Sequence, residues 1–194
     1  FVLLNLSWYL EHPGSIFVLT DGGLSFHGGL AAGIVSGILY CRFRGIDRWL
    51  MADLAAPYIA LGYSIVRIGC FLRGCCYGVA TDVPWALPAS ELDDIPRHPT
   101  QLYSSALSLL LFIYLYSRRN HSGFKGMLMF QYVFLYSLVR FAVEFVREGE
   151  RLALGLTLAQ WVSLGVAVVA LALTGLLSYR FHKTGGNVVD AEAS

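Results

Sequence analysis

Apolar runs alternate with short polar segments along the whole of this chain. Five of the runs are helix-sized and cover residues 24–40, 50–72, 102–116, 127–146 and 156–179. Because a helix needs about 20 mostly apolar residues to cross the hydrocarbon core of a bilayer, the pattern predicts five full membrane spans. Residues 1–10 are apolar but too short to cross, and we interpret them as the outer end of a further helix. We therefore expect an all-α integral membrane protein, a polytopic helical bundle with a small loop region on its outer face.

The composition supports this class of protein. Of the 194 residues, 56% are hydrophobic and only 14% are charged, against roughly 25% charged in soluble domains. The net charge of +1 gives no reason to expect nucleic-acid binding, which needs a clustered cationic surface. We expect one membrane domain over residues 1–183 and a polar, disordered cytoplasmic tail over residues 184–194.

The basic residues divide between the two ends of the predicted spans. Two connectors and the C-terminal tail, which fall on one side, carry Arg42, Arg44, Arg48, Arg118, Arg119, Lys125, Arg180 and Lys183. The positive-inside rule identifies that side, and with it the C-terminus, as cytoplasmic. The other basic residues are all arginines and lie at the opposite ends of the spans or inside them: Arg67, Arg73, Arg97, Arg140, Arg147 and Arg151. A guanidinium at membrane depth is costly and suits bidentate binding of phosphate, so these arginines predict a phospholipid site that faces the outer leaflet.

The fourth span contains the clearest polar face. Tyr136, Arg140, Glu144 and Arg147 recur at helical spacing. One interpretation is a structural Arg–Glu pair that ties helices together. The other is that Tyr136 and Arg140 point into a polar cavity while Glu144 orients the guanidinium.

Two further residues are predicted at the depth of Arg140. Counting 1.5 Å per residue places Arg67 of the second span at a similar height, so two arginines from two helices are expected to converge. His27, flanked by Gly28 and Gly29, enters the first span from the outside. Its side chain is suited to proton transfer near neutral pH, although a structural role is the alternative.

Two motifs near the outer surface are harder to interpret. In the segment RHPTQLY, Pro99 and Thr100 are expected to start and cap a helix, while His98, Gln101 and Tyr103 fit either headgroup contact or local structure. Cys70, Cys75 and Cys76 form C-x4-C-C on the side where disulfides persist. A bridge from Cys70 to one of the vicinal pair is geometrically easier than a bridge within the pair. The spacing matches no zinc motif, so no metal site is expected.

Four segments together resemble the prolipoprotein diacylglyceryl transferase family. They are LSFHGGL, RIGCFLRGCCYG, RHPTQLY and YSLVRFAVEFVR, in this order. The resemblance implies that His27, Arg67, Tyr136 and Arg140 are catalytic. It also implies that the substrate is bound by Arg67, Gly78, His98, Gln101, Tyr103, Arg140, Glu144 and Arg147. Arg73, which replaces a residue of the family signature, is expected to offer a further cation for the phosphate. Asp53 and Pro57 are similar to the family's D-x-x-x-P.

The resemblance also implies an activity. Members of the family move the diacylglyceryl group of phosphatidylglycerol to the lipobox cysteine of a prolipoprotein signal peptide, releasing glycerol phosphate. We accordingly expect a monomeric enzyme of the bacterial inner membrane without a metal or other cofactor, shortened by about the first one to two helices of the family. Cys70, Arg73 and Cys75 depart from the family signature. The alternatives are a transferase with a different acceptor and a non-catalytic phospholipid-binding membrane protein.

Overall fold

The computed structural model describes residues 26–89, 93–120, 123–147 and 149–183. Its five long helices match the five predicted runs to within a few residues: α2 (Phe26–Arg44), α3 (Arg48–Leu72), α4 (Thr100–Ser117), α5 (Met127–Glu144) and α6 (Leu158–Lys183). A single 3-10 turn, η3 (Ala153–Gly155), precedes α6. Residues 1–25 and 184–194 lie outside the described residues. The predicted end of a further helix in residues 1–10 and the predicted disordered tail over residues 184–194 therefore stay predictions.

Three of the helices are long and apolar enough to cross a membrane, namely α3, α5 and α6. The crossing of the bilayer by α2 and α4 stays a prediction. The first half of α4 is polar, and its Thr100, Gln101, Ser104, Ser105 and Ser108 are all buried. These buried side chains lower the apolar character of the helix and supply contacts to its neighbours.

The chain divides into two compact units, residues 1–48 and 49–194. In the first unit, α2 ends at Gly45, whose φ of 64° is in the left-handed region. The Ile46 N–H donates to the Cys41 carbonyl at 2.9 Å, which closes the last turn in the manner of a Schellman motif.

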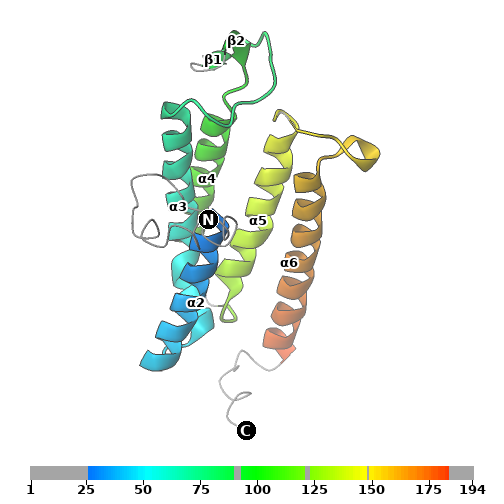
Figure 1. Cartoon of the computed structure of the whole chain (residues 1–194). Helices are drawn as coiled ribbons and strands as arrows, with labels where there is room; N and C mark the ends of the chain where they lie inside the picture. The colour runs from blue at the N-terminus through cyan, green and yellow to red at the C-terminus, as the bar shows by residue number, and fades with distance from the viewer. Residues whose placement is uncertain (1–25, 90–92, 121–122, 148, 184–194) are drawn as a thin grey trace, which may run out of the picture. The chain divides into compact units, whose positions relative to one another are not determined.

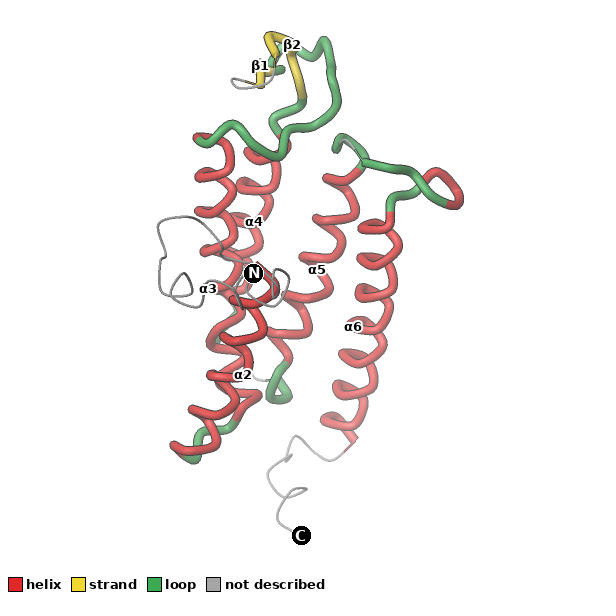
Figure 2. Tube along the Cα trace, in the orientation of Figure 1, coloured by secondary structure: helices red, strands yellow, loops and turns green. Residues whose placement is uncertain are grey.

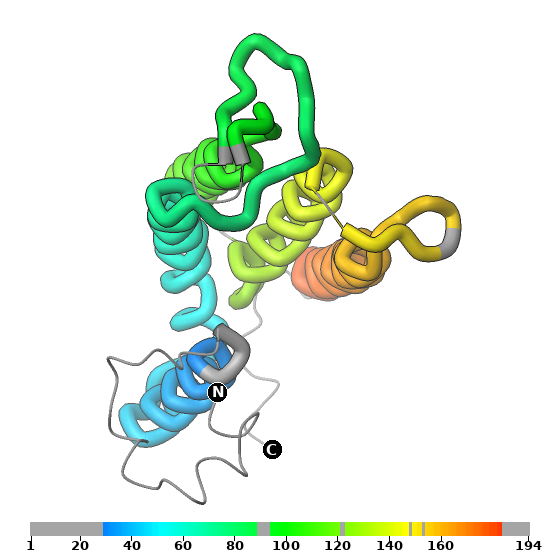
Figure 3. Tube along the Cα trace, turned by 45° about the horizontal axis from the view of Figure 1, so that its top comes forward, coloured from blue at the N-terminus to red at the C-terminus, as the bar shows by residue number. Residues whose placement is uncertain are grey.

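In the second unit, α3, α4, α5 and α6 run up and down in turn beside one another (Figures 1 and 2). Helix α5 packs against both α4 and α6, and the tilted view in Figure 3 shows α5 between these two helices. Ser64 and Ser105 join α3 to α4 by donating to each other's backbone carbonyls at 2.9 and 3.0 Å. Small residues of this kind let two helices approach closely inside a membrane.

The apolar core lies between α3, α4 and α5. Ala60, Leu111 and Leu115 form its buried centre, and the half-buried side chains around them include Leu128, Tyr132 and Tyr136. Many other apolar side chains of the helices are exposed, such as Leu110 of α4 and Val162 and Val169 of α6, at 57–62%. Apolar side chains on the outside are expected of helices whose outer faces meet lipid rather than water.

A two-stranded sheet follows α3, in the region that was expected to be loop only. Strands β1 (Leu87–Ala89) and β2 (Asp93–Arg97) are antiparallel and pair Leu87 with Arg97 and Pro88 with Pro96. Prolines interrupt both strands, and proline cannot donate to a ladder, which explains why the sheet stays so short. The all-α prediction therefore needs this one correction.

Two helix starts are fixed by specific contacts. Asp53 of α3 accepts hydrogen bonds from the backbone N–H groups of Gly126 at 2.7 Å and Met129 at 3.0 Å, and so caps α5 from a neighbouring helix. At the start of α6, the Thr157 N–H donates to Gln160 Oε1 at 2.9 Å, and the Gln160 N–H donates to Thr157 Oγ1 at 3.3 Å. The second arrangement is a capping box.

Candidate functional site

Glu144 is the centre of a charged cluster at the end of α5. Its side chain is only 8% exposed, yet it is fully engaged. It accepts a hydrogen bond from Arg140 Nη1 one turn earlier, pairs with Arg147 Nη1 at 3.7 Å, and accepts a hydrogen bond from Thr157 Oγ1 at 3.2 Å. One buried carboxylate thus orients two guanidinium groups that are each partly exposed, at 23% of the side chain.

Arg67 of α3 is held by a tyrosine on its own helix. Its Nε and Nη2 donate to the Tyr63 hydroxyl at 2.8 and 2.5 Å, and its guanidinium carbon lies 4.8 Å from the centroid of the Tyr63 ring. The two residues are four apart, so they share one face of the helix. The contact fixes the direction of a cation that is half-buried.

Tyr63 also connects α3 to α5. Its ring meets the Tyr136 ring edge-on, with 5.2 Å between centroids, and Tyr136 stacks on Tyr132 at 5.7 Å. Tyr136 precedes Arg140 by one helical turn. The two helices that carry Arg67 and Arg140 therefore contact each other through Tyr63 and Tyr136, while the convergence of the two arginines themselves stays a prediction.

The predicted polar cavity at Tyr136 and Arg140 remains a prediction. Two cavities found among the described residues, of about 260 and 310 Å³, lie at the other end of this unit, where α3 and α5 begin. Asp53, Arg119 and Leu128 line both.

The segment RHPTQLY holds the loop that follows α3 in place by hydrogen bonds. Gln101 Nε2 donates to the Cys75 carbonyl at 2.6 Å, and Thr100 Oγ1 donates to the Cys76 carbonyl at 2.8 Å. Thr100 was expected to cap α4, but its hydroxyl bonds the loop instead, and the N-cap position is Pro99, which offers no side-chain cap. The Gln101 side chain is completely buried, so its contacts are those of local structure.

The side chains of His98 and Tyr103 contact each other. His98 Nδ1 lies 3.2 Å from the Tyr103 hydroxyl, which also accepts a hydrogen bond from Trp85 Nε1 at 2.6 Å. Both side chains are half-buried. Their contacts are local, although each keeps part of its surface free.

Gly78 lies where the loop, α4 and the end of α5 meet. Its N–H donates to the His98 carbonyl at 2.9 Å, and the next N–H, that of Val79, donates to the Val146 carbonyl at 3.0 Å. A Cβ at position 78 would overlap the Val146 carbonyl oxygen and would come within 2.7 Å of His98 Cβ and 2.8 Å of Thr100 Cγ2. Only glycine fits this junction, so a packing role accounts for Gly78.

The remaining predicted arginines lie in connecting segments. Arg73 is exposed in the turn after α3. Arg97 belongs to β2 and also bridges to Ala80. Arg151 is exposed and donates to the Gly155 carbonyl at 3.0 Å, so its contact is local to the turn before α6.

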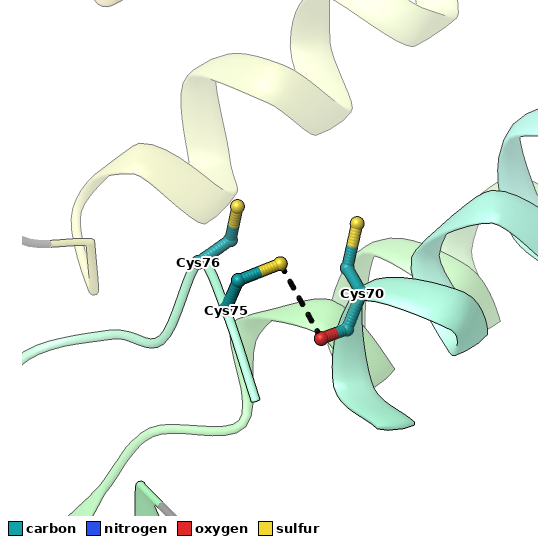
Figure 4. Close-up of side chains that lie close together, drawn as sticks. All are labelled: Cys70, Cys75 and Cys76. Carbon is teal, nitrogen blue, oxygen red and sulfur yellow. Dashed lines mark hydrogen bonds between the residues drawn. The ribbon is translucent and has the colours of Figure 1, made fainter. Parts of the chain in front are cut away.

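The three outer cysteines lie together (Figure 4). The Sγ atoms of Cys70, Cys75 and Cys76 are all within 4.8 Å of one another, and each of these cysteines is free. Cys75 Sγ donates to the Cys70 carbonyl at 3.5 Å. Burial, together with the adjacent thiols of Cys76 and Cys70, raises the pKa of Cys75 to about 11, so this thiol stays protonated at neutral pH when nothing is bound. The predicted disulfide from Cys70 is not formed in this structure.

His27 is in the first turn of α2, but its side chain lies outside the described residues. It also belongs to the first of the two units. Its proton-transfer role stays a prediction.

Two residues of the site were missed by sequence reasoning. Tyr63 carries a visible signal, because it precedes Arg67 by one turn on the face that bears the cation. Thr157 carries a second signal, since it opens the T-x-x-Q pattern of a capping box. Its contact to Glu144 depends on how α5 and α6 pack, which no local pattern reveals.

Comparison with known proteins gives a consistent result. A family model described as "Prolipoprotein diacylglyceryl transferase" matches residues 1–176. Curated relatives named "Phosphatidylglycerol--prolipoprotein diacylglyceryl transferase" include those of Geobacter sulfurreducens, 36% identical over 91% of this chain and 70% of the relative, and Methylobacillus flagellatus, 36% identical over 86% and 66%. The protein of that name from Wolinella succinogenes is 35% identical over 89% and 66%. The chain thus spans about two thirds of the length of the curated relatives that it matches.

Proposed function

The chain belongs to the family of prolipoprotein diacylglyceryl transferases, and we propose that it transfers the diacylglyceryl group of phosphatidylglycerol to a prolipoprotein cysteine. The acceptor is the lipobox cysteine of the signal peptide. In this reaction the sulfur attacks the glycerol carbon that carries the phosphate. A C–S thioether bond forms, the C–O bond to the phosphate breaks, glycerol phosphate leaves, and the thiol proton passes to a base. The modification is the first step of bacterial lipoprotein maturation.

The observation that carries the proposal is the tyrosine contact between the two helices that bear the arginines. Arg67 of α3 donates to Tyr63, whose ring meets that of Tyr136 on α5, and Tyr136 precedes Arg140 by one helical turn. Negative charge grows on the leaving phosphate as the C–O bond breaks, and cations held in place beforehand stabilise it without reorganising. In the proposal these two arginines bind the phosphate, and Tyr136 donates a hydrogen bond to it.

Glu144 and Arg147 support this role from the end of α5. Because Glu144 is buried and engages both Arg140 and Arg147, it limits the directions in which they can point. His27 accepts the thiol proton or orients the headgroup. Arg73, His98, Gln101, Tyr103 and Gly78 are proposed to line or shape the headgroup site, and for Gln101 and Gly78 this means holding the loop rather than touching the lipid.

The proposed enzyme acts as a monomer in the inner membrane. Its α2 and α4 cross the membrane as well as α3, α5 and α6, and residues 1–183 form a single domain. Basic residues gather where α4 and α6 end, including Arg118, Arg119, Arg180 and Lys183. By the positive-inside rule this end and the C-terminus are cytoplasmic. The arginine site at the opposite end then opens toward the outer leaflet.

A transfer assay tests the proposal. Membranes that contain the chain are incubated with phosphatidylglycerol, labelled in its acyl groups, and a lipobox peptide. The expected products are a labelled peptide and free glycerol phosphate in equal amounts. Binding of the lipid without either product would instead indicate a phospholipid-binding protein, and label on a peptide whose cysteine is replaced by serine would indicate another acceptor.

The matched variants are Arg140→Lys and Arg118→Lys. The first keeps the charge but loses the planar, bidentate donor set, so its transfer rate is expected to fall at least about ten-fold, which corresponds to roughly 1.4 kcal/mol. The second changes an arginine at the opposite end of the bundle and is expected to leave the rate unchanged. Full activity of Arg140→Lys would contradict the phosphate-binding role.

A further inference from the structure

The three cysteines at the end of α3 bring their sulfur atoms close together. Cys70 is in the last turn of the helix, and Cys75 and Cys76 are in the loop that turns back toward it (Figure 4). All three Sγ atoms lie within 4.8 Å of one another. Cys70 and Cys75 are half-buried, whereas Cys76 is exposed. A cluster of this kind is open on one side.

The spacing is near that of a metal–thiolate set. A Zn–S bond of about 2.3 Å in tetrahedral geometry separates neighbouring sulfurs by about 3.8 Å. Because the largest separation here is 4.8 Å at most, the sulfurs need to move together by no more than about 1 Å to match this spacing.

The loop is held in this shape without the help of an ion. Gly74 and Cys76 have φ values of 71° and 64°, and the latter is an uncommon conformation for a residue with a side chain. Buried side chains of α4 keep it there, since Gln101 and Thr100 bind the carbonyls of Cys75 and Cys76. A strained backbone conformation of this kind persists where several surrounding contacts hold it. Such conformations are common at sites that bind ligands.

We propose that Cys70, Cys75 and Cys76 bind one thiophilic divalent cation of the Zn²⁺ class as three thiolates, with a water in the fourth position. Each sulfur coordinates as a thiolate, so a proton that it carries is released as the ion binds. Thiolate sulfur favours ions of this class over Mg²⁺ or Ca²⁺. The exposed side of the cluster, at Cys76, leaves room for the fourth ligand.

The charge of the occupied site is balanced by its neighbours. Three thiolates and a divalent ion carry a net charge of −1. The guanidinium of Arg67 interacts electrostatically with Cys70 and Cys76, and Arg73 is in the same turn. A bound ion also fastens the loop to the end of α3, so it stabilises the segment that follows Arg67 whether or not the chain is a transferase.

Metal titration of the purified chain tests this inference. The full chain in detergent is reduced, stripped with a chelator and titrated with Cd²⁺, which gives an ultraviolet thiolate-to-metal charge-transfer band. We expect the band to saturate at one Cd²⁺ per chain and to disappear when Zn²⁺ competes. Absence of the band from the reduced chain would overturn the proposal.

Serine variants locate the ligands. Cys70→Ser, Cys75→Ser and Cys76→Ser are each expected to weaken Cd²⁺ binding at least ten-fold, whereas Cys41→Ser, which changes the cysteine in α2, leaves binding unchanged. Thiol counting on protein prepared without reductant provides a second test that needs no variant. Two missing thiols among these three, restored by a reductant, would assign the cluster to a disulfide and overturn the metal site.

Discussion

Thr157 donates a hydrogen bond to Glu144 across the junction of α5 and α6, with 3.2 Å between Thr157 Oγ1 and Glu144 Oε1. The other carboxylate oxygen of Glu144 faces Arg140 and Arg147. Thr157 also opens the capping box of α6. The start of one helix is therefore connected through a single carboxylate to the arginines at the end of another.

Glu144→Gln is expected to lower transfer activity at least about ten-fold while the protein still folds. The amide keeps an acceptor for Thr157 but loses the charge that orients Arg140 and Arg147, and hydrogen bonds to charged groups contribute about 1.5–3 kcal/mol. The measurement is the transfer rate on membranes with equal amounts of protein. Glu150→Gln, at an exposed position a few residues away, is the control and should retain the parental rate. Equal rates for both variants would remove Glu144 from the orienting role.

Tyr63→Phe is expected to reduce kcat/KM by about ten-fold. The phenyl ring keeps its edge-on contact with Tyr136, but both hydrogen bonds from Arg67 lose their acceptor, at a cost of about 1–2 kcal/mol. Tyr58→Phe changes an exposed tyrosine of the same helix and should behave as the parent does. Parental kcat/KM in Tyr63→Phe would show that the tyrosine does not position Arg67.

Gly78→Ala is expected to destabilise the fold by about 1–3 kcal/mol or more, since the added methyl overlaps backbone and side-chain atoms on three sides. Gly69→Ala is a matched control in α3, where a Cβ meets nothing within 4 Å and alanine favours the helix. Thermal unfolding in detergent measures both variants. The idea fails if position 78 tolerates alanine as well as position 69 does.

Asp53→Ala is expected to lower stability by about 0.5–2 kcal/mol, the usual cost of losing a helix cap. Asp53→Asn keeps one side-chain acceptor for the Gly126 and Met129 N–H groups, so its loss should be smaller. The comparison uses denaturant or thermal midpoints of the two variants. Equal losses would mean that the charge of Asp53, rather than its accepting oxygens, stabilises the start of α5.

Local sequence patterns were enough to predict the helices and the family. Apolar runs are set by local composition, because a span must present hydrocarbon to lipid along its length, and all five runs became helices close to their predicted bounds. The polar face of Tyr136, Arg140 and Glu144 followed from helical spacing alone. The short hairpin of β1 and β2 did not, because its strands are brief and contain prolines.

What several of these residues contact depends on how the helices pack against one another. Gln101 and Cys75 are 26 residues apart, and Tyr63 meets Tyr136 across two helices. Contacts of this kind depend on which side of each helix is turned toward its neighbour and on where the helices lie along the bundle axis. The periodicity within one segment contains no information about either. The clustering of Cys70, Cys75 and Cys76 has the same origin, since buried side chains of α4 fold the loop back onto the end of α3.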